Sequence, residues 1–185
     1  MTGYVGNCNN IIDWQSVVDT IKDKEPGYIG PRHKEGDAVV GIDDIALKWK
    51  EAGYITAAKG GNAGWGMYFA GTHFDQSVVD TFSEYVGITP ISAWISRIDP
   101  GMMAPWHWDA NDNEEEYSTM ELERYSVHIC KPQPGHVFAV DDIVMYNQSQ
   151  GDTFKWTSRK SWHGGGNCGL TPKYLFNIFG ERNGS

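Results

Sequence analysis

The segment APWHWD, residues 104–109, places a histidine and an aspartate two positions apart. Side chains alternate between the two faces of an extended strand, so His107 and Asp109 share one face while Trp106 and Trp108 share the other. An imidazole nitrogen and a carboxylate oxygen on one face can hold a metal ion if another part of the chain supplies a third ligand. We expect the two tryptophans to pack outward against a layer of helices.

The third ligand has to come from a distant histidine, and His163 is the strongest candidate. It stands in SWHGGGN, where three consecutive glycines would let a ligand approach the backbone closely. His128 is a second candidate, with a hydrogen-bonded core histidine as the alternative interpretation. His33 and His73 fall in loop segments, and His136, at the start of a predicted strand, is expected to be exposed.

Two histidines and one carboxylate are the ligands of the facial triad found in non-haem iron enzymes. His107, Asp109 and His163 would occupy one face of the metal and leave three positions for a cosubstrate and O₂. The same ligands also fit zinc. A surface pair of His107 with Asp109 would need no metal at all.

The elements that must position these residues change character at Pro90. From there, short β-like runs alternate with turns built from Pro, Gly, Asp and Ser. Eight short strands at near-regular spacing predict a double-sheet jelly roll. The eight runs are ISAWISRI (91–98), APWHWD (104–109), RYSVHIC (124–130), HVFAV (136–140), DIVMYNQ (142–148), DTFKWTS (152–158), SWHGGGN (161–167) and PKYLFNIF (172–179).

The first half of the chain has helical periodicity. Apolar residues recur at helical spacing in residues 11–24, 41–54 and 74–87, and Gly87 is expected to cap the last of these helices. A glycine-rich segment, 57–71, predicts a mobile loop that runs into a short strand. We therefore expect one domain over residues 1–185. Its residues 1–89 would form a helical buttress and a lid loop, and residues 90–180 would form the β core.

Composition excludes several kinds of partner. The net charge of -9 argues against binding to a nucleic-acid backbone. No apolar run approaches the ~20 residues of a membrane span, and the first residues lack a signal-peptide pattern. Cys8, Cys130 and Cys168 form no CxxC pair, which favours reduced thiols in a cytoplasmic protein. The expected partner is a small molecule or a peptide, and the oligomeric state is left open.

Residues 97–180 resemble the iron(II)- and 2-oxoglutarate-dependent oxygenases, and within them are most similar to the aspartyl/asparaginyl β-hydroxylase-like branch. The segments RIDPGMMAPWHWD, ERYSVHI, GDTFKW, WHGGGN and KYLFNIFG carry the resemblance. It implies a double-stranded β-helix in which His107, Asp109 and His163 bind iron(II). It also implies 2-oxoglutarate and O₂ as cosubstrates, and hydroxylation of an Asp or Asn side chain or a related amino acid, with release of succinate and CO₂.

The resemblance further implies which residues bind 2-oxoglutarate. A basic residue about ten positions after the distal histidine binds the far carboxylate, and here that residue is Lys173. A lysine in an apolar strand is costly unless paired, although a snorkelling lysine is the alternative. The branch carries an Arg-x-His pair on the third strand, where this chain has Ser126 and His128. Arg124 lies on the same strand face and can take the place of the missing arginine.

An acidic insert, residues 110–123, separates Asp109 from the next strand. We expect it to cover the site as a lid, with a solvated acidic face as the alternative. Tyr117, Trp65 and Tyr68 are candidate substrate contacts.

The sequence thus predicts an iron(II)- and 2-oxoglutarate-dependent dioxygenase. Two alternatives stay open. One is a jelly-roll domain that binds a metal or a ligand without turnover, and the other is a cupin-like metalloenzyme that does not use 2-oxoglutarate.

Overall fold

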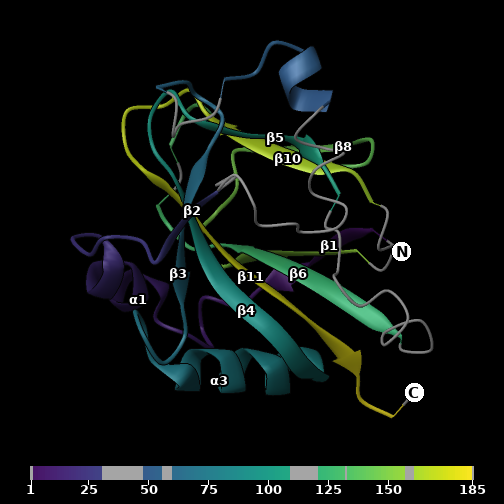
Figure 1. The fold of residues 1–185 in the computed structure, drawn as a ribbon. Helices are drawn as coiled ribbons and strands as arrows, with labels where there is room; N and C mark the ends of the chain where they lie inside the picture. The colour runs from purple at the N-terminus through teal and green to yellow at the C-terminus, as the bar shows by residue number, and fades with distance from the viewer. Residues whose placement is uncertain are drawn as a thin grey trace, which may run out of the picture.

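Two antiparallel sheets and a layer of helices make up the fold in a computed structural model, which describes residues 2–30, 48–55, 60–108, 121–131, 133–156 and 161–184 (Figure 1). Residues 48–51 are also helical. The elements are β1 (Gly3–Asn7), α1 (Trp14–Ile21), β2 (Tyr28–Gly30), β3 (Trp65–Phe69), α3 (Gln76–Val86), β4 (Ile88–Ile98), β5 (Met103–His107), β6 (Leu122–His128), β7 (His136–Val140), β8 (Ile143–Tyr146), β9 (Asp152–Trp156), β10 (His163–Asn167) and β11 (Lys173–Arg182).

The strand order is that of a jelly roll. Strands β9, β6, β11 and β4 are neighbours in the seven-stranded sheet, and β5, β10, β7 and β8 form the four-stranded sheet. The two sets of four face each other, because side chains of β9 and β11 contact β7 across the gap. The prediction of a double-stranded β-helix from residue 90 onward is confirmed, and each of the eight predicted runs overlaps one of these strands.

The N-terminal half adds strands as well as helices. β1 pairs with β9 at one edge of the seven-stranded sheet, while β3 pairs with β4 and β2 lies at the other edge. β3 was expected, whereas β1 and β2 were not. Short edge strands of this kind gain their stability from the neighbour they pair with, so local sequence gives little sign of them.

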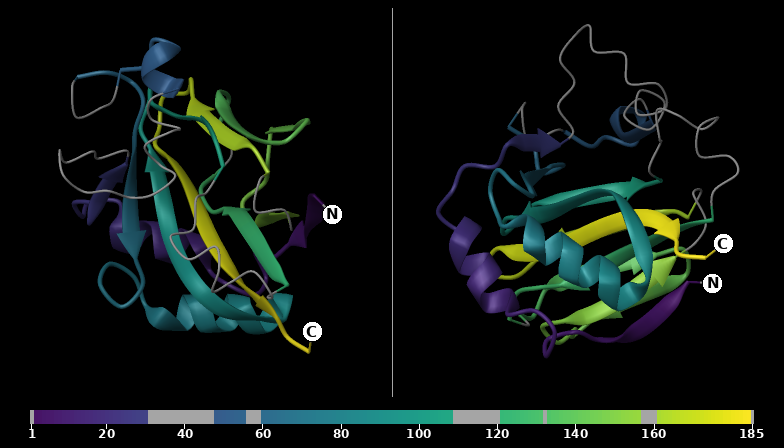
Figure 2. Two further views of the ribbon diagram at one scale, coloured as in Figure 1. Left: turned by 45° about the vertical axis from the view of Figure 1, so that its right-hand side comes forward. Right: turned by 90° about the horizontal axis from the view of Figure 1, so that it is seen from below.

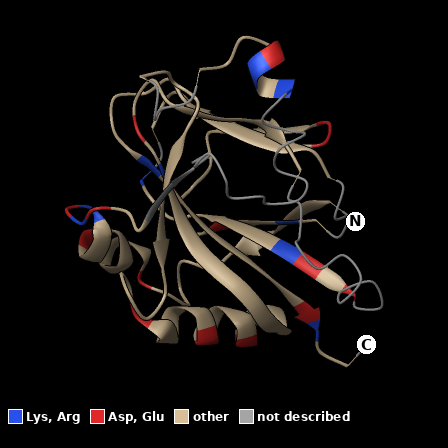
Figure 3. Cartoon of the chain, in the orientation of Figure 1, with Lys and Arg blue, Asp and Glu red and all other residues tan. Residues whose placement is uncertain are grey.

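Helices α1 and α3 lie on the outer face of the seven-stranded sheet (Figure 2). Both were predicted. Asp13 and Asp75 cap their N-termini by accepting hydrogen bonds from the backbone N–H groups of Ser16 and Ser77. Gly87 ends α3 with a positive φ of 75°, as expected of a helix cap. Acidic residues occur along α3 (Figure 3), and Asp80 and Glu84 are exposed.

The main hydrophobic core lies between these helices and the sheet. Phe176 of β11 is fully buried there, with its ring centroid 5.3 Å from those of Trp14 on α1 and Phe82 on α3. Tyr174 and Ile178 share the face of Phe176 because strand residues alternate. The opposite face of β11 therefore points between the two sheets.

The prediction that Trp106 packs against the helices is wrong. Strand β5 belongs to the four-stranded sheet, whereas α1 and α3 cover the seven-stranded one. Trp106 is consequently 41% exposed, and Trp108, just beyond the end of β5, is half-buried. Strand parity fixes which residues share a face, but it does not say which sheet the strand joins.

All three cysteines are free, with Cys8 and Cys130 buried and Cys168 exposed, which confirms the prediction of unpaired thiols. Within the described ranges, no helix is long and apolar enough to cross a membrane.

Candidate metal centre

His107 and His163 lie side by side on neighbouring strands. His107 is the last residue of β5, His163 is the first of β10, and the two are register partners. Their ring centroids are 4.3 Å apart. His163 is 8% exposed and His107 is half-buried. The structure thus brings together two histidines that are 56 positions apart in the sequence (163 minus 107).

Each of these imidazoles is oriented by a backbone carbonyl two residues earlier. His107 Nδ1 lies 2.7 Å from the Pro105 carbonyl oxygen, and His163 Nδ1 lies 3.1 Å from that of Ser161. A carbonyl oxygen only accepts hydrogen bonds, so each Nδ1 must donate. In the neutral ring, Nε2 then keeps its lone pair, and a hydrogen bond from the other ring nitrogen is how metal-binding histidines are usually held.

Three tryptophan side chains pack against the histidine pair. Trp65 stacks on His107 at 5.6 Å with an interplanar angle of 17°, and Trp49 meets the same ring edge-on at 5.7 Å. Trp156 lies 5.4 Å from His163. These aromatic side chains restrict water around the imidazoles. None of these tryptophans offers a metal ligand, so any further protein ligand for a metal at the histidine pair has to come from another part of the chain.

Several predicted site residues lie outside the described residues. They are Asp109, Tyr117 and most of the acidic insert, residues 110–120. The end of the insert is described, and there the predicted boundary is wrong. Glu123 is a residue of β6 and accepts hydrogen bonds from Tyr125 and Lys155, so it belongs to the sheet.

Trp65 and Tyr68, both considered as substrate contacts, have different places. Trp65 contacts His107, as described above. Tyr68 is fully buried in the core on the helix side of the seven-stranded sheet, and its hydroxyl donates to the Lys24 carbonyl oxygen. Tyr68 therefore does not line the space between the sheets.

Lys173 points between the two sheets and is fully buried. Its Nζ donates a hydrogen bond of 2.5 Å to the Val137 carbonyl oxygen and lies 5.5 Å from the ring centroid of Phe138. Burial lowers the pKa of Lys173 to about 7. The alternative of a snorkelling lysine is excluded, because such a side chain would keep its amine in water.

The absence of a side chain at Gly165 lets this amine lie close to β10. A Cβ at Gly165 would lie 3.3 Å from Lys173 Nζ and 2.9 Å from the Val137 carbonyl oxygen. Gly165 is two residues from His163 on β10, which corresponds to about 7 Å along an extended strand. A buried cation thus lies within one small dicarboxylate's length of the histidine pair. The glycine run was singled out in the sequence, but its contact with Lys173 was not.

Ser126 and Arg124 share the inner face of β6, as strand parity predicted. Ser126 Oγ donates to Asn177 Oδ1 at 2.9 Å, and Asn177 Nδ2 donates to Ser96 Oγ at 3.0 Å. Arg124 is 5% exposed, and its guanidinium lies 5.0 Å from the ring centroid of Phe179. These polar groups lie on the seven-stranded sheet, opposite the histidine pair.

His128 lies with Cys130 and His136 and not with His107. Burial, together with the charge of Lys173, lowers the pKa of His128 to about 3, so the ring is neutral. The expectation that His136 is exposed is wrong, since it is only 3% exposed. Its Nε2 lies 3.1 Å from the Thr171 carbonyl oxygen, because the β6–β7 connection folds back against the start of β11.

Comparisons with known proteins give only distant structural similarity. No family model and no curated protein matches the sequence. The structure is similar to a Pseudomonas putida prolyl-4-hydroxylase, with a TM-score of 0.47 and 13% identity over 92% of this chain and 100% of that one. For an oxidoreductase of the 2OG-Fe(II) oxygenase family from Burkholderia pseudomallei, the TM-score is 0.47 and the sequence identity 15%, over 83% of this chain and 95% of that one. For a cupin domain from Bordetella pertussis, the TM-score is 0.33 and the sequence identity 13%, over 50% of this chain and 91% of that one. Identities this low leave the function to be argued from the chain's own residues.

Proposed function

We propose that this protein is an iron(II)- and 2-oxoglutarate-dependent dioxygenase. The observation that carries the proposal is the buried amine of Lys173 beside Gly165, two residues along β10 from His163. A small dicarboxylate can extend from a metal at the histidines to this amine. A metalloenzyme that does not use such a cosubstrate has no need of a fully buried lysine at that distance.

His107 and His163 would hold the iron through Nε2, with Asp109 as the third protein ligand. Their orientation by backbone carbonyls and their adjacency support this assignment. Bound iron with 2-oxoglutarate supplies O₂ activation for substrate hydroxylation, with succinate and CO₂ as products. The protein's own contribution is to fix the two imidazoles, exclude water with Trp65 and Trp156, and orient the cosubstrate.

Lys173 would bind the far carboxylate of 2-oxoglutarate. In the apolar space beside Phe138 and Leu175, a carboxylate is stable only next to a cation, and the protonated amine supplies that charge. The missing side chain at Gly165 lets the amine lie close to β10, the strand that begins at His163. Ser126 and Arg124, on the inner face of the facing sheet, would contact the rest of the cosubstrate.

The first test measures binding of 2-oxoglutarate to protein loaded with Mn(II), an air-stable substitute for iron(II). Lys173→Ala should weaken that binding by two to three decades, since breaking a buried ion pair costs about 3–5 kcal/mol. It should leave Mn(II) binding nearly unchanged. His107→Ala and His163→Ala should instead weaken Mn(II) binding. Lys22→Ala, which removes an exposed lysine, is the matched control and should change neither.

A second test addresses turnover and the substrate. The resemblance to the aspartyl/asparaginyl β-hydroxylase-like branch leads us to propose an Asp or Asn side chain or a related amino acid. Succinate release should be stimulated by one class in a panel of Asp- and Asn-containing peptides, free amino acids and small metabolites. Wild-type protein that does not bind 2-oxoglutarate at all would replace the proposal with a jelly-roll binding domain or a cupin-like metalloenzyme.

A further inference from the structure

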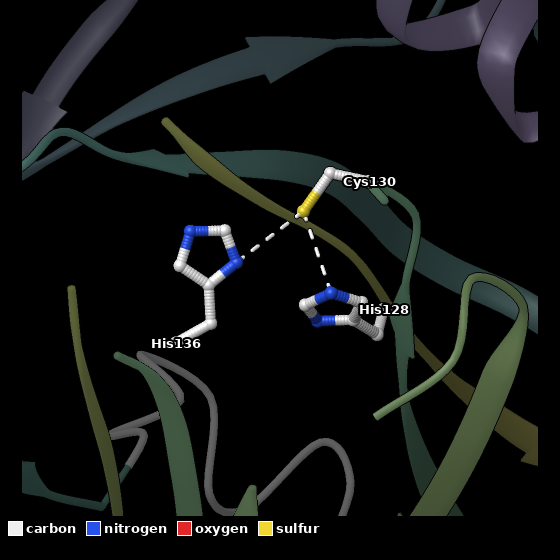
Figure 4. A group of neighbouring side chains, drawn as sticks. All are labelled: His128, Cys130 and His136. Carbon is white, nitrogen blue, oxygen red and sulfur yellow. Dashed lines mark hydrogen bonds between the residues drawn. The ribbon is translucent and has the colours of Figure 1, made fainter. Parts of the chain in front are cut away.

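A second group of metal-binding side chains lies at the connection between β6 and β7. Cys130 Sγ is 3.4 Å from His128 Nε2 and 3.8 Å from His136 Nδ1, and all three residues are buried. Their ligand atoms lie within 4.8 Å of one another. Figure 4 shows a nitrogen atom of each imidazole directed toward the sulfur.

The backbone orients this group for coordination. His136 Nε2 lies 3.1 Å from the Thr171 carbonyl oxygen, which only accepts, so Nε2 carries the proton and Nδ1 presents its lone pair to the sulfur. The backbone N–H of Tyr174 donates to Cys130 Sγ at 3.4 Å. Burial raises the pKa of the Cys130 thiol, and this hydrogen bond offsets part of that rise.

One sulfur and two imidazole nitrogens, all of them metal-ligand atoms, converge at one point. Without a metal, Cys130 Sγ can accept a hydrogen bond from His128 Nε2 and donate one to His136 Nδ1, because a thiol both donates and accepts. A metal cation placed among the three atoms would instead take one lone pair from each of them.

We propose that His128, Cys130 and His136 form a zinc site, separate from the histidine pair of the proposed iron centre. Tetrahedral zinc has bonds of about 2.3 Å to sulfur and about 2.0–2.1 Å to nitrogen, which places sulfur and nitrogen about 3.5 Å apart. The observed separations of 3.4 and 3.8 Å match this value. A thiolate with two imidazoles suits zinc better than magnesium or calcium, which prefer oxygen ligands.

The site would tie three segments of the chain together. His128 ends β6, Cys130 lies two residues beyond it, and His136 begins β7. The hydrogen bonds to Thr171 and Tyr174 connect this group to the start of β11. Since the ligands are buried, the metal has to enter as the chain folds. We therefore expect zinc to stabilise the folded protein and to be retained after purification.

The test refolds the full chain with Co²⁺, a spectroscopic substitute for zinc, and removes loosely bound metal. Wild-type protein should retain one Co²⁺ that has a thiolate-to-cobalt charge-transfer band and the intense visible bands of tetrahedral cobalt. Cys130→Ser should lose the charge-transfer band. Cys168→Ser and Cys8→Ser, which remove the other two thiols, should keep it.

The proposed iron centre contains no cysteine, so the two sites can be separated. His107→Ala should keep the charge-transfer band. The cobalt experiment therefore tests the zinc site whether or not the protein binds 2-oxoglutarate. His136→Gln tests the second ligand. It should lower the affinity for Co²⁺ by more than the roughly 10–100-fold that loss of an outer hydrogen-bond partner costs. If Cys130→Ser does not fold, His136→Gln still tests the zinc site. Wild-type protein that refolds without the band would overturn the zinc site, and so would a band that disappears in Cys168→Ser or Cys8→Ser.

Discussion

Replacing Lys173 with methionine should make the protein more stable while abolishing its binding of 2-oxoglutarate. The pKa of Lys173 falls from 10.5 to about 7 through burial. A shift of that size corresponds to about 5 kcal/mol of free energy that opposes folding at pH 7. The hydrogen bond from Nζ to the Val137 carbonyl oxygen offsets about 1–3 kcal/mol of it. Lys173→Met keeps the shape of the side chain and should therefore raise the free energy of unfolding by roughly 2–4 kcal/mol.

The pH dependence follows from the direction of the shift. Below about pH 7 Lys173 is protonated in both the folded and the unfolded protein, so the full free-energy cost of burying its charge opposes folding. Between about pH 7 and 10.5 only the unfolded state is protonated, so the wild type gains stability with rising pH. The advantage of Lys173→Met in urea unfolding should thus shrink steadily from pH 7 to pH 10.

Lys22→Met, at an exposed lysine, is the control and should change the stability by less than about 0.5 kcal/mol. A Lys173→Met protein that is less stable than wild type at pH 7, yet binds 2-oxoglutarate normally, would refute the reasoning. The lysine would then be a structural residue.

Three further predictions concern other parts of the fold. Gly165→Ala should weaken 2-oxoglutarate binding, because its Cβ would crowd Lys173 Nζ, whereas Gly166→Ala, with only one distant neighbour at 4.0 Å, should not; calorimetry on both variants distinguishes them. Glu123→Gln should destabilise the protein by about 1–3 kcal/mol at pH 7. Burial raises the pKa of Glu123, but hydrogen bonds from Tyr125 and Lys155 outweigh this and lower it, so the difference in urea unfolding should diminish as the pH falls through that pKa; a difference that grows in acid would contradict this. Gly87→Ala should lower the free energy of unfolding by about 1–2 kcal/mol, because an alanine is strained at a φ of 75°. Gly3 has an ordinary φ and no atom within 4 Å of the position that a Cβ would take, so thermal unfolding of Gly3→Ala should show no comparable loss of stability.

The jelly-roll strands could be predicted because each carries its own signal. Alternating apolar residues between proline and glycine turns located β7 at its observed bounds, and located β5 and β10 closely enough to place His107 and His163 on them. The H-x-D spacing needed no tertiary information. The exposure of Trp106 did, because it depends on which sheet β5 joins.

The group around Cys130 could not be predicted for a similar reason. His128 and Cys130 share a strand face, which parity reveals, but His136 reaches them only because the intervening connection folds back. Proline and glycine in KPQPG indicate a turn without specifying its path. The contact of Gly165 with Lys173 likewise depends on how the two sheets are aligned, which no single strand encodes.

The position of β11 has a consequence for how the chain acquires its fold during synthesis. This strand follows β4 and β6 in the sequence, yet it lies between them and pairs with both. Until β11 emerges from the ribosome, β4 and β6 each present an unpaired edge, and Phe176 is missing from the core beneath them. The nascent chain therefore depends on a late, long-range insertion step, a kind of step that is slow and leaves partly folded chains prone to aggregation. Chaperone demand should accordingly be concentrated in the interval before that strand is released.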